Sequence, residues 1–425
     1  MAQLSDDCFA FGEALTPLDE ALNALHERTE PIADMCDVPV SGAVGRILAE
    51  DIAATFNVPP HDNSAVDGYA VYYDDLDPKI ETRLPVTGRA AAGHPLGRST
   101  QRGEVIRIFT GAPMPMGDAG PDTVMMQEDC RVDGDHVVIA PGIKRGANRR
   151  TAGEDIRENE IVLHAGQVLR PQDIGVAASL GRTRLRVFEP LRVAVFSSGD
   201  ELREPGNTLD PGAIFDANRF ALAAALSQLG CAVTDLGIIR DDETVIRTAL
   251  AEAAATHDLL VTSGGMSTGE EDHIKATVEA LGSLHFWRLA IKPGRPVALG
   301  QIDTPRGPIP FAGLPGNPVA AIVTFLVIAR PLILRLSGAT DVAPISYRVR
   351  AGFDHRKKIS RREFVRAKIV ADTDGWPKAE KHGRSGAGVL SSLVGADGLV
   401  ELPEDMTFLK AGSMVDFLPF TEVMP

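Results

Sequence analysis

The sequence predicts a multidomain fold of the α/β plus β class, in which a central sheet is covered by helices on both faces and accompanied by β-rich domains. Three observations lead to this fold class. From Leu191 to about Ser337, buried-strand patterns alternate with helical patterns, as in a largely parallel sheet. Between residues 61 and 144 the segments are short, alternating and separated by Gly and Pro, which indicates β-structure. The same pattern returns after Pro344, where we expect a small β-barrel or sandwich.

Composition and charge set limits on the binding partners. The chain has 425 residues, of which 44% are apolar and 24% charged, an ordinary globular composition. It carries 43 Lys and Arg against 58 Asp and Glu, a formal net charge of −15, which excludes nucleic-acid or anionic-membrane binding driven by net charge. Residues 345–385 are locally basic, with 12 Lys or Arg against five Asp or Glu. This segment can hold a small anion, although a solvated basic strand face is the simpler explanation of the charges alone.

The cysteines and the N-terminus predict a cytoplasmic protein. The cysteines form neither a CxxC pair nor a zinc-like cluster with histidines, so we expect reduced thiols. The start of the chain lacks the basic and apolar pattern of a signal peptide. The longest apolar stretch, residues 319–329, is far shorter than the roughly 20 residues of a membrane-spanning helix. The four cysteines are Cys8, Cys36, Cys130 and Cys231.

The first expected element is a helix that starts at Thr16 and Pro17. Thr is a good N-cap, and Pro suits the first helical position. Three leucines at helical spacing share one face of it, and residues 57–60 (NVPP) end the pattern. Residues 171–180 predict a second short helix, which we expect to pack back on the first. The three leucines are Leu18, Leu22 and Leu25.

The elements of the central domain follow in order. Strands are expected at 191–196, 232–239, 258–262 and 309–312, and helices at 220–229, 243–256 and from residue 318 to about 337. Asp242 is the expected N-cap of the second of these helices.

Four loops follow the predicted strands, and in an open parallel sheet such loops meet at the edge where ligands bind. Their glycines let backbone N–H groups approach an oxyanion, and the helix N-terminus that follows adds its positive end. Each loop alone is most simply a turn, and Asp242 alone a helix cap, but together they predict a phosphate site. The residues concerned are Ser198, Gly199, Ser263, Gly264, Gly265, Ser267, Pro315, Gly316 and Asn317.

Carboxylates near these loops predict a hard cation such as Mg²⁺, because bare carboxylates repel phosphate. The candidate metal ligands are Asp200, Asp242 and Asp272. No GxxxxGK[ST] motif is present, which excludes a P-loop nucleotidase.

Two basic segments are candidates for binding a tetrahedral oxyanion. Lys292 and Arg295 flank a Pro-Gly kink that is followed by Pro296, although a surface turn explains this hexapeptide equally well. Farther along, Arg362 and Arg366 are expected on one face of a strand, because side-chain direction repeats every two residues. No residue arrangement indicates nucleophilic catalysis.

Several longer motifs resemble the molybdopterin molybdenumtransferase family, whose members are related to the gephyrin E domain. The resemblance runs from about Thr16 to Pro419. The most specific segments are 62–71 (DNSAVDGYAV), 110–115 (TGAPMP), 126–129 (MQED), 153–155 (GED), 263–272 (SGGMSTGEED), 292–296 (KPGRP) and 314–319 (LPGNPV).

The resemblance implies an elongated homodimer with four domains in each chain. Residues 1–55 and 145–188 would form a split helical and linker domain, and residues 56–144 a β-rich insertion. Residues 189–340 would form a three-layer α/β/α molybdopterin-binding domain, and residues 345–425 a C-terminal β-barrel. The active cleft would lie between the sheet domain of one subunit and the β-rich domain of the other.

The implied reaction inserts molybdate into adenylylated molybdopterin with Mg²⁺ as cofactor. The dithiolene takes up molybdenum, the pyrophosphate bond is hydrolysed, and molybdenum cofactor and AMP leave. Molybdopterin adenylyltransferase and acceptor molybdoenzymes or their chaperones are implied partners, with no role for nucleic acid or a membrane.

Residue by residue, the resemblance assigns roles to three groups. Asp272, Ser267 and Asp242 correspond to the Mg²⁺ and phosphate site. Molybdate binding falls to Lys292, Arg295, Pro296, Arg366 and Ser392. The facing subunit would contribute Asp62, Asp67 and Thr110.

The chain departs from the family pattern at two positions. Ala320 stands where many relatives have Ser, and Arg295 where Lys is frequent, which bears on the choice between molybdate and tungstate. Two alternatives remain. One is a carrier or scaffold that binds pterin or molybdate without turnover. The other is an enzyme of the same sheet superfamily, such as the pterin adenylyltransferase or an amidase-like relative.

Overall fold

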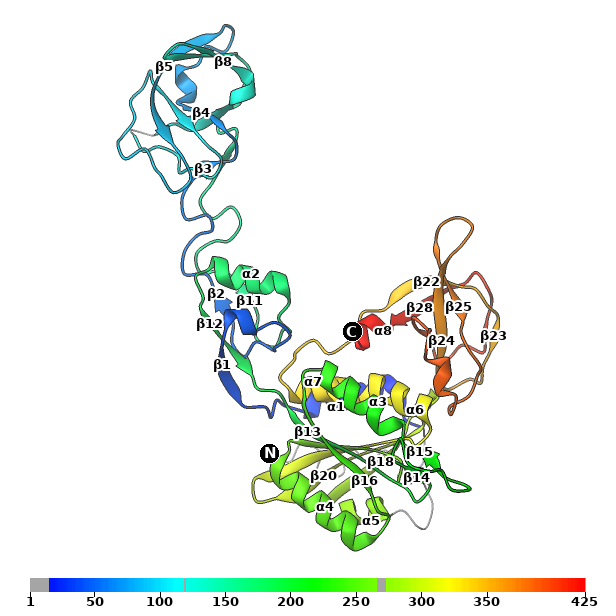
Figure 1. The fold of residues 1–425 in the computed structure, drawn as a ribbon. Coiled ribbons are helices and arrows are strands. Elements are labelled where there is room, and N and C mark those ends of the chain that lie inside the picture. Colours follow the sequence, from blue (N-terminus) through cyan, green and yellow to red (C-terminus); the bar gives the residue numbers. More distant parts are fainter. Residues whose placement is uncertain (1–14, 118–119, 266–272, 425) are drawn as a thin grey trace.

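The computed structural model describes residues 15–117, 120–265 and 273–424, and it shows an elongated molecule (Figure 1). A β-rich sheet lies at one end and the central sheet at the other, with the C-terminal barrel beside the central sheet. Short paired strands and one helix connect the two ends. The predicted fold class is confirmed.

The central sheet has six strands in the order β16-β13-β17-β21-β20-β18. The first four pair in parallel, as expected, whereas β21, β20 and β18 pair antiparallel. The sheet is therefore mixed, because β20 and β21 are joined by two residues, too few for a parallel crossover. The strands are β13 (Arg192–Ser198), β16 (Ala232–Ile239), β17 (Leu259–Ser263), β18 (Gly282–Arg288), β20 (Pro296–Thr304) and β21 (Gly307–Leu314).

Helices cover both faces of this sheet (Figure 1). Along β13, Val193 and Val195 belong to one hydrophobic core, and Ala194 and Phe196 to another, because successive strand residues point to opposite faces. The first core includes residues of α1, α3, α6 and α7, and the second includes residues of α4 and α5. The helices are α1 (Leu18–Arg28), α3 (Asn218–Gln228), α4 (Glu243–Thr256), α5 (His273–Leu281), α6 (Pro318–Thr324) and α7 (Arg330–Leu336).

The N-terminal helix differs from the prediction in its cap and in its packing. It begins at Leu18, Pro17 takes the N-cap position, and the Thr16 side chain does not cap it. Thr16 instead pairs with the central sheet, where its N–H donates to the Arg288 carbonyl over 2.9 Å. Helix α1 packs against α7, and not against α2 (Pro171–Ser179), which belongs to a separate core. The leucine face of α1 is thus buried against the central domain.

The longest helical segment runs from Pro318 to Leu336 as α6, a π-helical turn η5 (Phe325–Ala329) and α7. It has 19 residues and a mean hydropathy of 2.1, so its length and composition would suffice to cross a membrane. This span agrees with the helix expected from residue 318 to about 337, whereas the uninterrupted apolar stretch at residues 319–329 covers only part of it. However, 89% of its most apolar window is buried inside the protein, as in a core helix.

Three short strand pairings and α2 form the connection between the ends. β1 pairs antiparallel with β12, β2 with β11, and β3 with β10. A core around Leu48, Leu169 and Leu185 holds this region together. The bounds are β1 (Met35–Pro39), η2 (Val40–Gly42), β2 (Ile52–Ala53), β3 (Asn63–Ser64), β10 (Arg149–Arg150), β11 (Ile161–Leu163) and β12 (Arg184–Phe188).

The β-rich end contains a six-stranded sheet in the order β7-β4-β6-β5-β9-β8, in which only β5 and β6 pair in parallel. Separate apolar clusters lie on its two faces, one around Tyr69 and Val137 and one around Ala70 and Ile106. The elements are β4 (Gly68–Val71), η3 (Tyr73–Asp75), β5 (Thr82–Ala90), β6 (Val105–Ile108), β7 (Thr123–Met126), η4 (Gln127–Asp129), β8 (Cys130–Asp133) and β9 (His136–Ile139).

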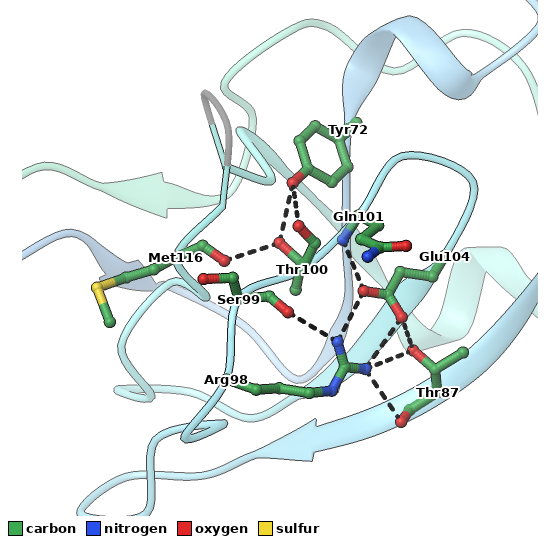
Figure 2. Close-up of polar contacts among 8 residues, drawn as sticks. All are labelled: Tyr72, Thr87, Arg98, Ser99, Thr100, Gln101, Glu104 and Met116. Atoms are coloured by element: carbon green, nitrogen blue, oxygen red, sulfur yellow. Dashed lines mark hydrogen bonds and ion pairs between the residues drawn. The ribbon is translucent and has the colours of Figure 1, made fainter.

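The connection between β5 and β6 is fixed by polar contacts (Figure 2). The Glu104 carboxylate accepts from Arg98 Nη1 and Nη2 over 2.9 and 3.0 Å, and from the Gln101 N–H over 2.7 Å. Nearby, the Thr100 hydroxyl donates to the Met116 carbonyl over 2.9 Å. These bonds order a long surface connection that has little apolar burial of its own.

The C-terminal domain is a closed five-stranded barrel, because β24 pairs with both β25 and β26 and so completes the ring β24-β25-β22-β28-β26. Strand β19 of the preceding segment adds to β24 from outside. The bounds are β19 (Ile291–Lys292), β22 (Tyr347–Ala351), β23 (His355–Arg356), β24 (Arg362–Ala371), β25 (Pro377–Lys381), η6 (Leu390–Ser392), β26 (Gly398–Leu402), β27 (Phe408–Leu409), β28 (Met414–Pro419) and α8 (Phe420–Val423).

The Glu104 network predicts an acid-sensitive contribution to stability. Hydrogen bonds from Arg98 lower the pKa of Glu104 from its ordinary value of 4.5 to about 2. A carboxylate with a depressed folded-state pKa stabilises the fold above its unfolded pKa, and this contribution is lost as the pH falls from about 4.5 toward 2. We expect Glu104→Gln to lower the free energy of unfolding by about 1 kcal/mol near neutral pH, since Arg98 is partly exposed and screened by solvent.

Urea denaturation at a series of pH values measures this difference, which should shrink below pH 4.5. Glu81→Gln is the matched control in the same domain, because its pair with Arg131 is exposed on both sides. A wild-type to Glu104→Gln difference that stayed constant down to pH 3 would contradict an electrostatic role.

Candidate functional site

The carboxyl ends of the parallel strands meet at one edge of the central sheet. In the pairing register, Ser197 lies beside Ser263 on one side, and Ser198 lies beside Ile239 on the other. Ser263 in turn lies beside Leu314. The four loops that begin at residues 197, 240, 263 and 313, after the predicted strands, therefore adjoin one another.

A pocket of about 90 Å³ opens among these loops. Its wall includes Ser198, Ser263, Gly264 and Gly316 of the predicted set. The hydroxyl of Ser198, and that of the neighbouring Ser197, is buried without a hydrogen-bond partner among the described residues. Buried hydroxyls without partners are costly unless a ligand or water satisfies them, so this pocket is suited to a polar ligand.

Asn218 at the start of α3 ties two of the loops together. Its side-chain amide donates to Ser263 Oγ and to the Gly316 carbonyl, each over 2.8 Å. Ser263 Oγ donates in turn to the Pro315 carbonyl over 3.1 Å. A Cβ on Gly264, whose φ is +91°, would lie 3.3 Å from the Ser198 carbonyl, so this close approach of loops favours glycine.

Glu201 is a lining residue of this pocket that the sequence analysis missed. It directly follows Asp200, the last residue of this loop among the predicted candidates. Its carboxylate lies 2.6 Å from the position that a Cβ on Gly199 would take, so the Glu201 side chain lies directly against this glycine. A carboxylate one residue beyond a glycine turn is the signal that could have identified it.

The segment β14 (Leu202–Arg203) and β15 (Ile214–Phe215) forms another wall of the pocket and is anchored by Arg219. Arg219 is 2% exposed and pairs with Asp216 over 2.9 Å, with Glu204 over 2.6 Å and with Asp235. Burial lowers the pKa of Arg219, but the carboxylates around it outweigh burial and raise it. This ion cluster fixes the wall to α3 and β16.

The predicted metal ligands are only partly within the structure. Asp242 caps α4, and its Oδ1 accepts from the N–H groups of Thr244 and Val245 over 2.9 and 3.0 Å. Asp200 is exposed at the end of β13. Asp272 and Ser267 lie outside the described residues. Within the described ranges, no group of three His, Cys, Asp or Glu side chains is arranged to hold a metal.

A second pocket, of about 150 Å³, lies between the Lys292–Pro293 turn and the barrel. Parallel pairing of β19 with β24 places Lys292 beside Glu363, and the Lys292 ammonium donates to Glu363 Oε1 over 3.1 Å. Arg366 lies in the wall of the same pocket. The structure thus brings together two cations that are 74 positions apart in the sequence.

Arg366 is buried, with 7% exposure, and no carboxylate forms an ion pair with it in the part of the chain that the structure describes. Its guanidinium donates to Ser392 Oγ over 3.1 Å and to the carbonyls of Arg384 and Gly386 over 2.9 and 3.4 Å. Burial lowers the pKa of Arg366. A buried cation without a neutralising carboxylate is suited to an anionic ligand.

Arg362 shares the strand with Arg366 but has different neighbours. It pairs with Asp19, Glu401 and Glu404 at 2.7 to 3.1 Å. These carboxylates neutralise Arg362, so Arg366 is the arginine of this strand that remains available to an oxyanion.

The rest of the basic turn packs against one side of α6, from Ala320 to Thr324. A Cβ on Gly294 would lie 2.3 Å from Thr324 Oγ1 and 3.0 Å from the Ala320 carbonyl, so only glycine allows this approach. Arg295 is half-buried, and burial together with the nearby Arg361 and Arg288 lowers the pKa of Arg295. Pro296 follows as the first residue of β20.

The three predicted residues of the β-rich end adjoin β3, β4 and β6, and Figure 1 shows β3 and β4 far from the central sheet and the barrel of the same chain. Asp67 Oδ1 accepts from the Thr110 N–H and hydroxyl, each over 2.8 Å, and these bonds lower the pKa of Asp67. Asp62 accepts from the Ala152 N–H over 2.8 Å and contacts Arg149 at 3.4 Å. Within one chain, therefore, this group does not join the central site.

Three family models match consecutive parts of this chain. Residues 16–181 match the MoeA N-terminal region (domain I and II), residues 194–335 a probable molybdopterin binding domain, and residues 348–420 the MoeA C-terminal region (domain IV). The molybdopterin molybdenumtransferase of Haemophilus influenzae is 37% identical over 90% of this chain and 93% of its own length. That of a Nostoc species is 34% identical over 89% and 87%, respectively.

This chain belongs to the molybdopterin molybdenumtransferase family. The resemblance identified from the motifs is confirmed. The crystal structure of a molybdopterin biosynthesis moeA protein from Pyrococcus horikoshii OT3 has the same fold, with a TM-score of 0.81 at 28% identity, over 96% of this chain and all of that one. A second structure of a moeA protein from the same organism gives 0.76 at 30% identity.

The contacts of Asn218 generate a prediction for this family member. Asn218→Ala removes both bonds that join the loops at Ser263 and Gly316, so we expect amide hydrogen exchange in peptides covering Gly264 and Gly316 to accelerate by about tenfold. Hydrogen–deuterium exchange mass spectrometry measures this rate. Ser227→Ala on the same helix is the control, because its hydroxyl donates only within α3. Equal exchange in both variants would show that Asn218 does not hold the loops.

Proposed function

We propose that this chain is a molybdopterin molybdenumtransferase that inserts molybdate into adenylylated molybdopterin and hydrolyses its pyrophosphate bond, releasing molybdenum cofactor and AMP. Its expected protein partners are the adenylyltransferase that makes the substrate and the molybdoenzymes or chaperones that accept the product. The observation that carries the proposal is the buried Arg366, which has no neutralising carboxylate in the described part of the chain.

The pocket at Arg366 is the proposed molybdate site. Molybdate is a dianion with four oxygen acceptors, and this pocket offers the Arg366 guanidinium and the Lys292 ammonium. Ser392 supports Arg366 from behind, because its Oγ accepts from Arg366 Nε. Charge-assisted hydrogen bonds of this kind are about twice as strong as neutral ones. Concentrating molybdate beside the dithiolene would supply much of the rate by proximity.

The pocket at the sheet edge is the proposed site for the phosphates of the adenylylated pterin. The buried hydroxyls of Ser197 and Ser198 lack partners among the described residues, and the backbone at Gly264 and Gly316 is open to close approach. The two hydroxyls can donate to phosphate oxygens without adding negative charge, whereas the Gly264 N–H already donates to the Leu314 carbonyl over 3.1 Å.

Mg²⁺ fits this edge as a cofactor held mainly by the substrate. Asp200 and Asp242 follow the neighbouring strands β13 and β16, and Mg²⁺ commonly binds one or two carboxylates together with substrate phosphates. Asp242 Oδ1 is already used as a helix cap, which leaves its other oxygen for this role. When bound, the ion would neutralise the pyrophosphate charge. Asp272 is proposed as a further ligand from its motif.

A homodimer would bring the β-rich group into this site. Asp62, Asp67 and Thr110 adjoin β3, β4 and β6 of the β-rich end, which Figure 1 shows far from the central sheet, so they can complete the site only if a second subunit presents them. The elongated arm between the two ends provides the reach for such an exchange.

The proposal predicts molybdate-dependent release of AMP from adenylylated molybdopterin in the presence of Mg²⁺. Arg366→Ala should raise the molybdate concentration needed for half-maximal release by about 10- to 100-fold, because a charge-assisted hydrogen bond is lost. Asp272→Ala should abolish release. Chromatographic quantification of AMP measures both effects with the purified protein.

Arg348→Ala is the matched control, since this exposed barrel arginine pairs with Asp416 away from both pockets. Tight binding of the pterin with no AMP release, with or without molybdate, would contradict the enzyme and leave a carrier or scaffold.

The dimer predicts complementation between two variants that are each impaired at a molybdate concentration near the half-maximal value of the wild-type protein. A heterodimer of Asp67→Asn and Arg366→Ala chains, co-expressed with different tags, contains one site with both changes and one intact site, so about half of the wild-type activity should return. The control heterodimer combines Asp242→Ala with Arg366→Ala, which damages both sites because these residues belong to the same half. Failure of the first heterodimer to exceed the second would contradict a shared site.

A further inference from the structure

The pocket at Arg366 contains a single carboxylate among its described lining residues, that of Glu363. A carboxylate in a site for a dianion opposes binding by repulsion, so its presence requires an explanation. The basic residues that line the same pocket are Lys292, His355, Arg366, Lys381 and His382.

Both oxygens of Glu363 are occupied by neighbouring bases. The Glu363 side chain is 5% exposed, and its Oε1 accepts from the Lys292 ammonium over 3.1 Å. Its Oε2 lies 2.9 Å from His355 Nε2. Burial opposes ionisation of Glu363, but the bonds from His355 and Lys292 outweigh burial and lower the pKa of Glu363. An ionised carboxylate only accepts, so Nε2 of His355 carries the proton of this bond.

The two partners of Glu363 come from different parts of the chain. Lys292 belongs to β19, which pairs with β24 beside Glu363, and His355 belongs to β23, which pairs with β27. The His355 ring also meets Phe353 edge-on, with 6.3 Å between the ring centres. Glu363 thus joins two segments, because one of its oxygens is bonded to His355 of β23 and the other to Lys292 of β19.

We propose that Glu363 is a positioning residue for oxyanion binding: with His355 bonded to one oxygen, it holds the Lys292 ammonium at the pocket in the orientation that meets molybdate. This inference rests on the proposed function, since it assigns the pocket to molybdate. Glu363 itself makes no contact with the anion and acts through Lys292.

The Glu363 carboxylate restricts the Lys292 side chain to one orientation. The Lys292 side chain is 58% exposed and has a flexible four-carbon stem. Without an anchor, this side chain would have to lose its rotamer freedom when the anion binds, which corresponds to about tenfold in affinity. The carboxylate fixes Lys292 before the anion arrives.

Simple charge repulsion predicts the opposite change in molybdate affinity when Glu363 is neutralised. If Glu363 acted only as a negative charge in the pocket, its neutralisation would strengthen molybdate binding. If it positions Lys292, neutralisation weakens binding. The direction of the change therefore separates the two effects.

The test is isothermal titration of molybdate into the full-length protein and its variants. Glu363→Gln keeps the size of the side chain and should weaken molybdate binding by about tenfold, with the binding of adenylylated molybdopterin unchanged. In AMP release, the KM for molybdate should rise with little change in kcat. His355→Gln places an amide donor near the position of Nε2 and should retain most of the affinity, whereas His355→Ala should not.

A double-mutant cycle tests whether Glu363 acts through Lys292. In the Lys292→Ala background, Glu363→Gln should have no further effect on molybdate affinity. Glu401→Gln is the matched control, because this barrel carboxylate pairs with Arg362 outside the pocket. Thermal unfolding of each variant checks that the barrel remains folded.

The outcomes separate this inference from the proposed function. Molybdate binding that depends on Arg366 but is unchanged or strengthened by Glu363→Gln would overturn the positioning role alone. A Glu363→Gln effect that persists without Lys292 would overturn it as well. No molybdate binding by the wild-type protein would overturn the proposed function, and the positioning role with it.

Discussion

The parallel register of β13, β17 and β21 is the constraint on which the site depends. It places Ser197, Ser263 and Leu314 side by side at the ends of their strands, so the loops that follow must converge. Hydrophobic cores on both faces of the sheet fix this register, since a slip by one residue would turn the apolar side chains of β13 to the wrong face. The hydrogen bonds of Asn218 then hold loops whose positions the sheet has already determined.

The second pocket depends on a join between two domains. Strand β19 leaves the central domain and pairs with β24 of the barrel, and this short pairing places Lys292 beside Glu363. The barrel supplies Arg366 and Ser392, whose side chains are bonded to each other over 3.1 Å. The pocket that we propose for an anion is thus lined by residues of both domains. Water is largely excluded around Arg366, so electrostatic interactions of its guanidinium are stronger there than at the surface.

Long-range packing also decides which charges are available. Asp19 of α1 lies 343 positions before Arg362 and pairs with it at 2.7 Å, because α1 packs against the central domain. The same packing ties the backbone of Thr16 to the sheet, which keeps Thr16 extended and prevents it from capping the helix. The position of α1 thus explains why Thr16 does not cap the helix, and it also provides one of the carboxylates that neutralise Arg362.

By itself, the sequence determined the alternation of strands and helices in the central domain, the helix cap of Asp242, the β-rich segments and the motifs of the family. These features depend on neighbours within a few residues, where periodicity and turn chemistry are strong. Tertiary structure decided the antiparallel half of the sheet, the packing of α1 against α7, the presence of Glu201 in the pocket, and the different surroundings of Arg362 and Arg366. Spacing along a strand tells which face a side chain takes, but the groups that neutralise it come from distant segments, and only folding brings those together.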